Sequence, residues 1–314
     1  MNDCMPSHII ELNANNGLPA FKALASQTRL KILSLLTDRD MNINELSLAL
    51  KIAQPSVTKH VQILEDAGLV VSDYAPGAQG TQKRCRRSFD RCIVNFEDAA
   101  RSTENVAEIE MPIGLYSIAE PKPTCGLASR TGWIGLLDEP VSFQFPQRAE
   151  AQILWMADGF VEYVFPNTLE PSVKVVGLEL MMEIASETPG YDNDFPSDIT
   201  LWINGIEIGS WRSPGDMGGC RGRLNPSWWA DNLNQFGFLK SWMVDGTGSY
   251  VDGIPISQVT IDQLGIEPYH RTTVRIGIKE DAACHGGFTL FGKGFGNYEQ
   301  DLLLRLRHSR KAKG

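Results

Sequence analysis

One stretch decides the fold of the first part of the chain: Gln54-Pro55-Ser56-Val57-Thr58-Lys59-His60-Val61-Gln62-Ile63-Leu64-Glu65-Asp66-Ala67-Gly68. Its apolar residues Val57, Val61 and Leu64 recur at helical spacing. Pro55 suits the first turn of a helix, because its missing N–H has no partner to lose there. The stretch therefore predicts a helix that starts at about Pro55 and stops at Gly68, a residue type that commonly ends helices.

Working outward, the residues before this helix predict three shorter ones. Leu18 to Leu36 shows helical spacing in two segments, with Ser26 placed to cap the second, and Asn42-Ile43-Asn44-Glu45 opens a third. A three-residue break, Lys51-Ile52-Ala53, then leads into the quoted helix. This is the helix-turn-helix arrangement, in which polar residues of the second helix reach base edges in the major groove. The candidates for DNA contact are Gln54, Ser56, Thr58, Lys59, His60 and Gln62.

Two predicted strands follow, Leu69 to Tyr74 and Gln82 to Phe89, joined by the turn Pro76-Gly77-Ala78-Gln79-Gly80. The net charge is −9 overall, but residues 1–94 carry +2 and the rest of the chain −11. Basic residues concentrate in the second strand, which favours contact with phosphates. We expect a wing that touches the DNA backbone through Lys83, Arg84, Arg86 and Arg87.

The first 95 residues resemble the arsenical-repressor (ArsR) class of bacterial winged-helix regulators. The resemblance is carried by Leu24-Ala25-Ser26-Gln27-Thr28-Arg29-Leu30-Lys31-Ile32-Leu33 and by Gln54 to Val70. It implies double-stranded operator DNA as a partner. The metal-sensing members place two cysteines in the helix before the recognition helix, where this chain has Glu45-Leu46-Ser47-Leu48-Ala49-Leu50. Sensing of soft metals at that position is therefore not expected.

The six cysteines form no C-x-x-C pair, which in a chain of 314 residues favours reduced thiols over a disulfide framework. Cys85, Cys92 and Cys284-His285 lack further ligands at metal-site spacing, so we expect buried, inert thiols and no metal or cofactor. No basic and apolar leader opens the sequence, and no apolar run spans a bilayer. These features predict a cytoplasmic protein without a membrane partner.

From about Met111 the hydrophobic period changes from 3.6 to 2. Apolar residues alternate from Val176 to Ile184, from Val274 to Ile278 and from Leu302 to Leu306, and Asn204-Gly205, Asp158-Gly159 and Asp252-Gly253 are hairpin signals. We predict an α+β multidomain chain: a winged helix-turn-helix over residues 1–95, a linker over 96–110, and a mainly antiparallel, jelly-roll-like β-sandwich over 111–314.

The β domain offers candidates for ligand binding. A turn at Asn204-Gly205 pairs Ile203 with Ile206 and Leu201 with Ile208, so that Trp202 faces Glu207 on the other side of the sheet. The stretch from Trp211 to Asp231 is longer than an ordinary hairpin loop. Aromatic rings beside carboxylates and guanidinium groups suit a sugar. The candidates for ligand contact are Trp202, Glu207, Trp211, Asp216, Arg221, Arg223, Trp228 and Trp229.

Enzyme signatures are weak in this sequence. Gly287 to Gly294 nearly matches a phosphate-binding loop, but Gly294 replaces the residue that would bind Mg²⁺. We therefore expect a non-enzymatic regulator whose β domain senses a small-molecule effector. The aromatic and charged residues of that domain favour a carbohydrate as this effector. A single winged helix reads too few base pairs for genomic specificity, so we also expect a homodimer. The alternatives are a β domain that serves dimerisation or protein binding, and an enzyme with a DNA-binding appendage.

Overall fold

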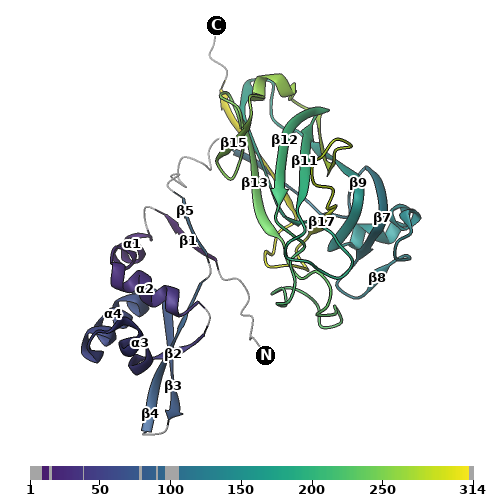
Figure 1. Cartoon of the computed structure of the whole chain (residues 1–314). Coiled ribbons are helices and arrows are strands. Elements are labelled where there is room, and N and C mark those ends of the chain that lie inside the picture. Colours follow the sequence, from purple (N-terminus) through teal and green to yellow (C-terminus); the bar gives the residue numbers. More distant parts are fainter. Residues whose placement is uncertain are drawn as a thin grey trace. The chain divides into compact units, whose positions relative to one another are not determined.

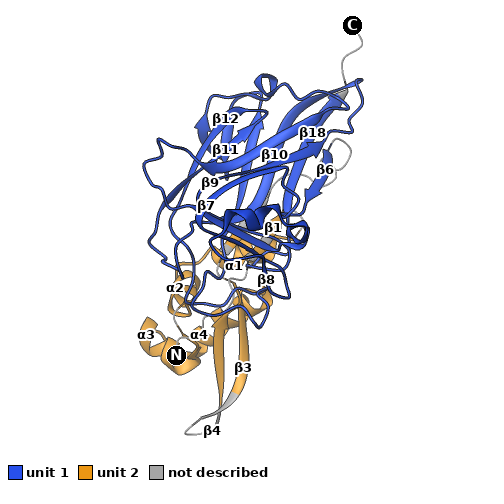
Figure 2. Ribbon diagram, turned by 90° about the vertical axis from the view of Figure 1, so that its right-hand side faces the viewer, with its two compact units in different colours: residues 1–6, 103–314 blue, residues 7–102 orange. Residues whose placement is uncertain are grey.

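A computed structural model of the chain describes residues 9–13, 16–37, 39–77, 80–89, 91–95 and 106–310. These residues fall into two compact units, one within residues 7–102 and one within residues 103–314 (Figure 2). The first combines short helices with short strands, whereas the second consists mainly of strands (Figure 1). Each unit encloses an apolar core of its own.

The smaller unit contains four α-helices and a three-stranded sheet in the order β2-β4-β3, and β1 pairs in parallel with β5. Its core includes the apolar faces of all four helices and Cys85 of β4. The elements are β1 (Ile9–Asn13), α1 (Leu18–Leu24), α2 (Gln27–Leu35), β2 (Met41–Asn42), α3 (Ile43–Leu50), α4 (Gln54–Asp66), β3 (Val70–Gly77), β4 (Gly80–Arg87) and β5 (Arg91–Asn95).

The predicted order of helices and strands is confirmed in this unit. Helix α4 buries Val57, Val61 and Leu64, and the chain turns away at Gly68, whose φ is +70°. The first wing strand is longer than expected, since β3 runs from Val70 to Gly77. The second, β4, has the expected length but starts and ends two residues earlier, at Gly80 and Arg87. Ala78 and Gln79, at the centre of the expected turn, lie outside the described residues.

The larger unit is built on a 13-stranded sheet whose described strand pairs are all antiparallel. Its elements are β6 (Val106–Met111), β7 (Ile118–Ala128), β8 (Trp133–Ile134), η1 (Pro140–Gln144), η2 (Pro146–Glu150), β9 (Ile153–Pro166), β10 (Val173–Ala185), β11 (Ser197–Ile203), β12 (Ile206–Ser213), β13 (Phe238–Asp245), β14 (Ser249–Val251), β15 (Ile254–Ser257), η3 (Ile261–Leu264), β16 (Arg271–Ile278), β17 (Phe288–Phe291) and β18 (Leu302–Arg310).

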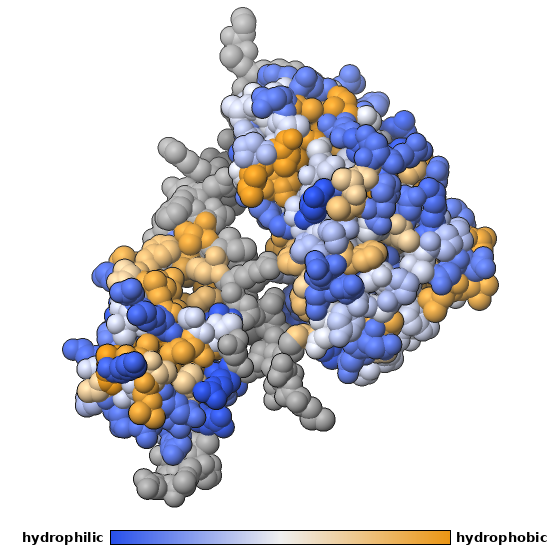
Figure 3. Space-filling model, in the orientation of Figure 1, coloured by the Kyte–Doolittle hydropathy of each residue, from blue (hydrophilic) through white to orange (hydrophobic). Residues whose placement is uncertain are grey.

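The sheet folds around one large core to which β7, β9, β10, β11, β13, β16, β17 and β18 all contribute. The predicted alternation is visible in part of β16 and of β18, where alternate apolar side chains are buried in this core: Val274, Ile276 and Ile278 in β16, and Leu302, Leu304 and Leu306 in β18. The predicted fold class is confirmed: a helix-turn-helix unit is followed by a large, antiparallel β-sandwich. Polar residues cover much of the visible surface of the β unit, with apolar residues gathered in patches (Figure 3).

Two of the three hairpin predictions are confirmed. Asn204-Gly205 joins β11 to β12 and Asp252-Gly253 joins β14 to β15, and all four residues have the positive φ that such turns require. The prediction for Asp158-Gly159 is wrong, because both residues lie inside the long strand β9. A Cβ on Gly159 would lie 1.8 Å from the carbonyl oxygen of Glu120, so this glycine allows strand β7 to pass close by.

The cysteines do not all behave as expected. Cys85, Cys92, Cys125 and Cys284 are free thiols, and burial raises the pKa of Cys85 and, to about 11, that of Cys125. Cys220 is disulfide-bonded, so the expectation of reduced thiols is wrong for this residue. Within the described residues no three His, Cys, Asp or Glu side chains gather where they could hold a metal ion. Across the same ranges, no helix is both long and apolar enough to cross a bilayer.

Candidate nucleic-acid interface and ligand pocket

The turn before α4 is built from local hydrogen bonds. Asn42 caps α3: its side-chain oxygen accepts from the N–H of Glu45 at 2.9 Å, and the Glu45 carboxylate accepts from the N–H of Asn42 at 2.7 Å. Lys51 ends α3 in the left-handed conformation, with φ of +56°. Extended Ala53 then starts α4, so the two helices are set at a fixed angle by a three-residue turn.

Helix α4 presents one polar face to solvent, because its apolar stripe is buried in the core. Gln54, Thr58 and Gln62 follow one another at intervals of four residues and are exposed. Thr58 Oγ1 donates to the Gln54 carbonyl at 3.0 Å, and Gln62 Nε2 donates to Asp66 Oδ1 at 2.9 Å. Ser56 and Lys59 are exposed beside this row. The structure thus brings five of the six predicted helix residues onto one accessible surface.

His60 is placed differently from the other five. It is half-buried, and its Nδ1 atom is buried without a hydrogen-bond partner among the described residues. The side chain of His60 therefore belongs partly to the packing of the unit.

The basic residues of β4 are divided between two faces of the strand. Lys83, Cys85 and Arg87 share one face, on which Cys85 is buried. Lys83 Nζ forms an ion pair of 2.7 Å with Glu65 of α4, and both side chains are largely covered. Arg84 and Arg86 lie on the opposite face, where Arg84 is exposed and Arg86 lies 4.0 Å from Asp73. Of the four predicted phosphate contacts, Lys83 is thus paired with Glu65, and Arg87 Nη1 donates to Thr37 Oγ1 at 3.3 Å. Arg84 is exposed and Arg86 is partly so.

The predicted ligand residues do not form one site. Trp202 and Glu207 face each other across β11 and β12 as expected, but a bulge pairs Leu201 with Gly209 instead of Ile208. Glu207 is engaged by Lys279 at 3.1 Å. Trp211 lies in β12 and not in a loop, and its ring packs edge-on against Trp242. These residues are separated in the structure from the tryptophans of the following loop, which form another cluster.

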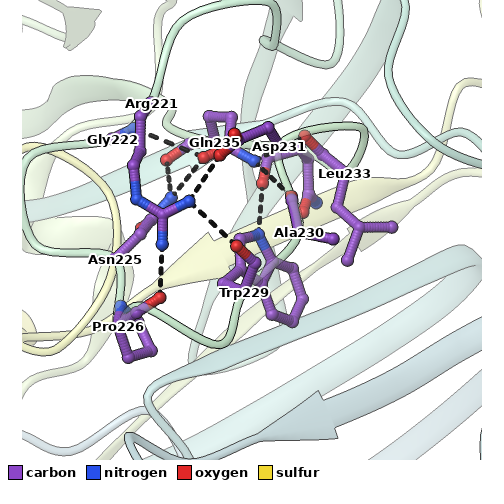
Figure 4. A network of polar contacts seen from close by, with 10 residues as sticks. Arg221, Gly222, Asn225, Pro226, Trp229, Ala230, Asp231, Leu233 and Gln235 are labelled. Carbon is purple, nitrogen blue, oxygen red and sulfur yellow. Dashed lines mark hydrogen bonds and ion pairs between the residues drawn. The ribbon is translucent and has the colours of Figure 1, made fainter.

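Arg221 holds its own loop together rather than facing outward (Figure 4). Its guanidinium donates to the carbonyl oxygens of Pro226 and Trp229, at 2.5 and 2.9 Å, and to Asp231 Oδ1 at 2.5 Å. Gln235 Nε2 donates to the carbonyls of Ala230 and Leu233 in the same network. The donors of Arg221 are directed into the loop, so its role here is to hold the loop's shape.

Three other predicted ligand residues are also tied into the structure. Asp216 is buried, and its Oδ2 accepts from the N–H of Thr188 at 3.1 Å; burial raises the pKa of Asp216 to about 8. Trp228 Nε1 donates to the Arg130 carbonyl at 2.7 Å. The backbone N–H of Arg223 donates to Asn297 Oδ1 at 3.0 Å, and the residue is exposed.

A pocket of about 170 Å³ lies beside the loop that joins β12 to β13. Its aromatic wall consists of Trp133, Trp155 and Trp229, which come from β8, β9 and the loop. The Trp133 ring lies 5.8 Å from that of Trp155 and 4.9 Å from that of Trp229, measured between centroids. Only Trp229 was among the predicted ligand residues. Trp133 was missed because a single tryptophan in a Gly-rich turn carries no periodic signal.

The polar side of the pocket centres on Glu187. Its carboxylate accepts from Thr124 Oγ1 at 3.2 Å and from Thr289 Oγ1 at 3.1 Å. Thr289 Oγ1 in turn accepts from Asn234 Nδ2 at 3.1 Å. Burial, with a smaller effect of nearby Asp216, raises the pKa of Glu187 well above its ordinary range. The result is an aromatic pocket with a connected polar base, which can hold a small molecule that has both apolar and hydroxyl groups.

Comparison with known proteins identifies the first unit. Residues 26–72 match the family described as "Bacterial regulatory protein, arsR family". Over 61 residues the chain is 34% identical to the transcriptional activator HlyU of Vibrio cholerae serotype O1, and over 57 residues 40% identical to the transcriptional repressor SdpR of Bacillus subtilis. These matches cover 19% and 18% of this chain. The chain spans 56% and 62% of the length of these two curated relatives.

The β unit is similar in outline to the CBM36-1 domain of a multidomain xylanase from the hindgut metagenome of Trinervitermes trinervoides. That structure is 10% identical, with a TM-score of 0.27, and the match covers 67% of this chain and 99% of that one. The likeness is too slight to carry an argument about function. Residues 26–72, which include α4 and its exposed polar face, therefore form a helix-turn-helix domain that matches the arsR family, and a large β unit follows it in the chain.

Proposed function

We propose that this chain is a bacterial transcriptional regulator that binds operator DNA through α4 and β4. The observation that carries the proposal is the exposed polar face of α4, which is held outward by a buried stripe in a domain of the arsR family. Gln54, Ser56 and Lys59 lie at or near the start of α4, the part of a recognition helix that reaches base edges. Arg84 and Arg86 contact the phosphates.

Lys59 and Lys22 allow a charge-matched test of this surface. Both are exposed lysines of the smaller unit, but Lys22 lies on α1, outside the proposed surface. Double-stranded oligonucleotides that the protein selects from a random pool serve as the DNA probe. We expect Lys59→Ala and Arg84→Ala each to weaken binding, and Arg84→Ala also to lower the slope of log affinity against log salt by ~0.9 for a lost phosphate contact. Lys22→Ala leaves both quantities unchanged.

Equal effects of Lys59→Ala and Lys22→Ala would show that only net charge matters and would refute the assignment. Gln54→Ala tests base reading separately, because loss of a base contact relaxes sequence preference whereas loss of a phosphate contact does not. We further propose that the protein acts as a homodimer in the cytoplasm, on half-sites about one helical turn apart. Sedimentation of the protein with selected DNA measures the stoichiometry, and one chain per selected site would contradict the dimer.

We also propose that the β unit is a sensor without catalytic activity, whose effector is a small molecule of the carbohydrate class. The support is the pocket that combines tryptophan rings with hydroxyl and carboxyl groups. Coupling requires that the effector bind the DNA-competent and DNA-incompetent states unequally, by ~1 to 3 kcal/mol in typical cases. By reciprocity, operator DNA must change the affinity for the sugar by the same factor. A sugar that binds the chain with the same affinity in the presence and absence of operator DNA would refute the sensing role.

A further inference from the structure

The pocket beside Trp133 is assembled from segments that are far apart in the sequence. Trp133 and Asp138 come from β8 and the segment after it, Glu187 follows β10, and Trp229 and Asn234 come from the loop before β13. Its volume of about 170 Å³ has room for one small ring rather than for a chain of several. Asp216 supports the pocket from behind, since it holds the N–H of Thr188, one of the lining residues.

Trp133 supplies an accessible aromatic face. It is 44% exposed, whereas Trp155 and Trp229 behind it are 8% and 2% exposed. The two buried rings therefore fix the orientation of the exposed one, so little side-chain freedom is lost when a ligand packs on it. An aromatic face held in this way suits the C–H face of a sugar ring, which is apolar although the ring's edge carries hydroxyl groups.

The polar groups of the pocket favour a ligand that donates hydrogen bonds. Asp138 and Glu187 bring carboxyl oxygens to the lining. Among the described residues that line the pocket, none is Lys, Arg or His. An anionic ligand would thus meet two carboxyl groups and no cation to offset its loss of hydration.

A cationic ligand is also disfavoured at the inner end of the pocket. The Glu187 carboxyl already has two hydroxyl partners, and burial raises its pKa well above the ordinary range. This end of the pocket therefore favours an uncharged carboxyl group over a fixed negative charge. Asp138, in contrast, is exposed, and its attraction for a cation is screened by salt.

We propose that this pocket binds one ring of a neutral carbohydrate, with the C–H face of the sugar on Trp133 and its hydroxyl groups on Asp138 and Glu187. This proposal rests on the proposed sensing role, because only that role makes the bound sugar the effector of the regulator. It also moves the ligand site away from Trp202, Glu207 and Arg221, which the sequence had favoured.

Isothermal titration calorimetry on the full chain tests the proposal with defined probes. The neutral probes are D-glucose, D-galactose, D-mannose, D-xylose and L-arabinose; D-glucuronate and glucose 6-phosphate are the acidic probes and choline is the cationic one. We expect at least one neutral sugar to bind, and both acidic probes and choline to bind at least tenfold more weakly. Trp133→Ala raises the Kd of that sugar at least tenfold, and Asp138→Asn raises it several-fold. Tyr269→Ala, which removes another exposed aromatic ring of the β unit, leaves the Kd unchanged.

The proposal is overturned if no neutral probe binds, if an acidic or cationic probe binds equally well or more tightly, or if Trp133→Ala retains sugar binding. Loss of binding in Trp202→Ala instead of Trp133→Ala would place the site on β11 and would also overturn it. Thermal melting of each variant verifies that it is folded. DNA affinity is measured without sugar, so a failure of the DNA-binding proposal is recognised independently of the sugar result.

Discussion

Glu183 of β10 makes the stability of the β unit depend on pH. The side chain is buried, and its carboxylate accepts from the backbone N–H groups of Gly237, Asn297 and Tyr298 at 2.9 to 3.0 Å. Burial raises the pKa of this carboxyl from 4.5 to about 8, although the three backbone donors act in the opposite direction. The folded protein therefore holds this proton more tightly than the unfolded chain does.

The direction of the pH effect follows from this difference. Below pH 4.5 the carboxyl is protonated in both states, and its contribution to stability is fully present. As the pH rises from 4.5 to about 8, the unfolded chain releases the proton while the folded one retains it, so stability falls. At ~1.4 kcal/mol per pKa unit, the difference between 4.5 and about 8 corresponds to a loss of up to ~5 kcal/mol.

Glu183→Gln removes the titration and keeps the size of the side chain. We expect the free energy of unfolding of the variant, relative to that of the unchanged protein, to rise by several kcal/mol between pH 5 and pH 8. All seven tryptophans of the chain lie between residues 133 and 242, so urea unfolding followed by tryptophan emission reports on the β unit. Asp216 titrates in both proteins, and its effect cancels in the comparison.

The control is Glu299→Gln, which changes an exposed carboxylate next to Tyr298. The stability of this variant should follow that of the unchanged protein at every pH. Parallel pH profiles for Glu183→Gln and the unchanged protein would refute the reasoning, because they would mean that the buried carboxyl has the same pKa in both states.

Three further changes have defined expectations. Leu64→Ala removes a buried side chain of α4, so we expect a loss of ~2 to 5 kcal/mol and weaker DNA binding, both measured on the full chain, with circular dichroism following the helices. Asn42→Ala removes the cap of α3 and the hydrogen bond to Gln82, so we expect the free energy of unfolding to fall by ~1 kcal/mol or more in the same measurement. An unchanged midpoint of the unfolding transition would contradict the role of Asn42 as a cap. Gly296→Ala places a Cβ 2.4 Å from the Glu183 carboxylate, at a φ of +73° that residues other than glycine rarely adopt. We therefore expect the free energy of unfolding to fall by more than ~1 kcal/mol, measured by urea unfolding with tryptophan emission.

The helical unit could be predicted in detail because its signals are local. The spacing of Val57, Val61 and Leu64 reports the buried face of one helix, and the Asn42-Glu45 capping box lies within four residues. The turn at Asn204-Gly205 is local for the same reason, since two residues with positive φ are sufficient to specify it.

The pocket could not be predicted in this way. Trp133, Glu187 and Trp229 are joined only by the strand order of the sheet, which places separate segments side by side. The guanidinium of Arg221 suits a ligand by its chemistry, but its partners are two carbonyl oxygens and a carboxylate of its own loop, and a residue type does not reveal such partners. The dipeptide Asp158-Gly159 predicts a turn, whereas the backbone that Gly159 accommodates belongs to β7, far away in the sequence.

Side-chain contacts hold the wing strand β4 to the helical part of the unit: Lys83 pairs with Glu65 of α4, Gln82 with Asn42 at the start of α3, and Arg87 with Thr37 after α2. The strand that presents Arg84 is thus locked to the helix that presents Gln54 and its neighbours. If the wing and α4 move together, a signal moves the whole surface that is proposed to contact DNA and leaves the base preference of α4 unchanged. An effector would therefore scale the residence time on strong and weak operators by one common factor and leave their rank order intact.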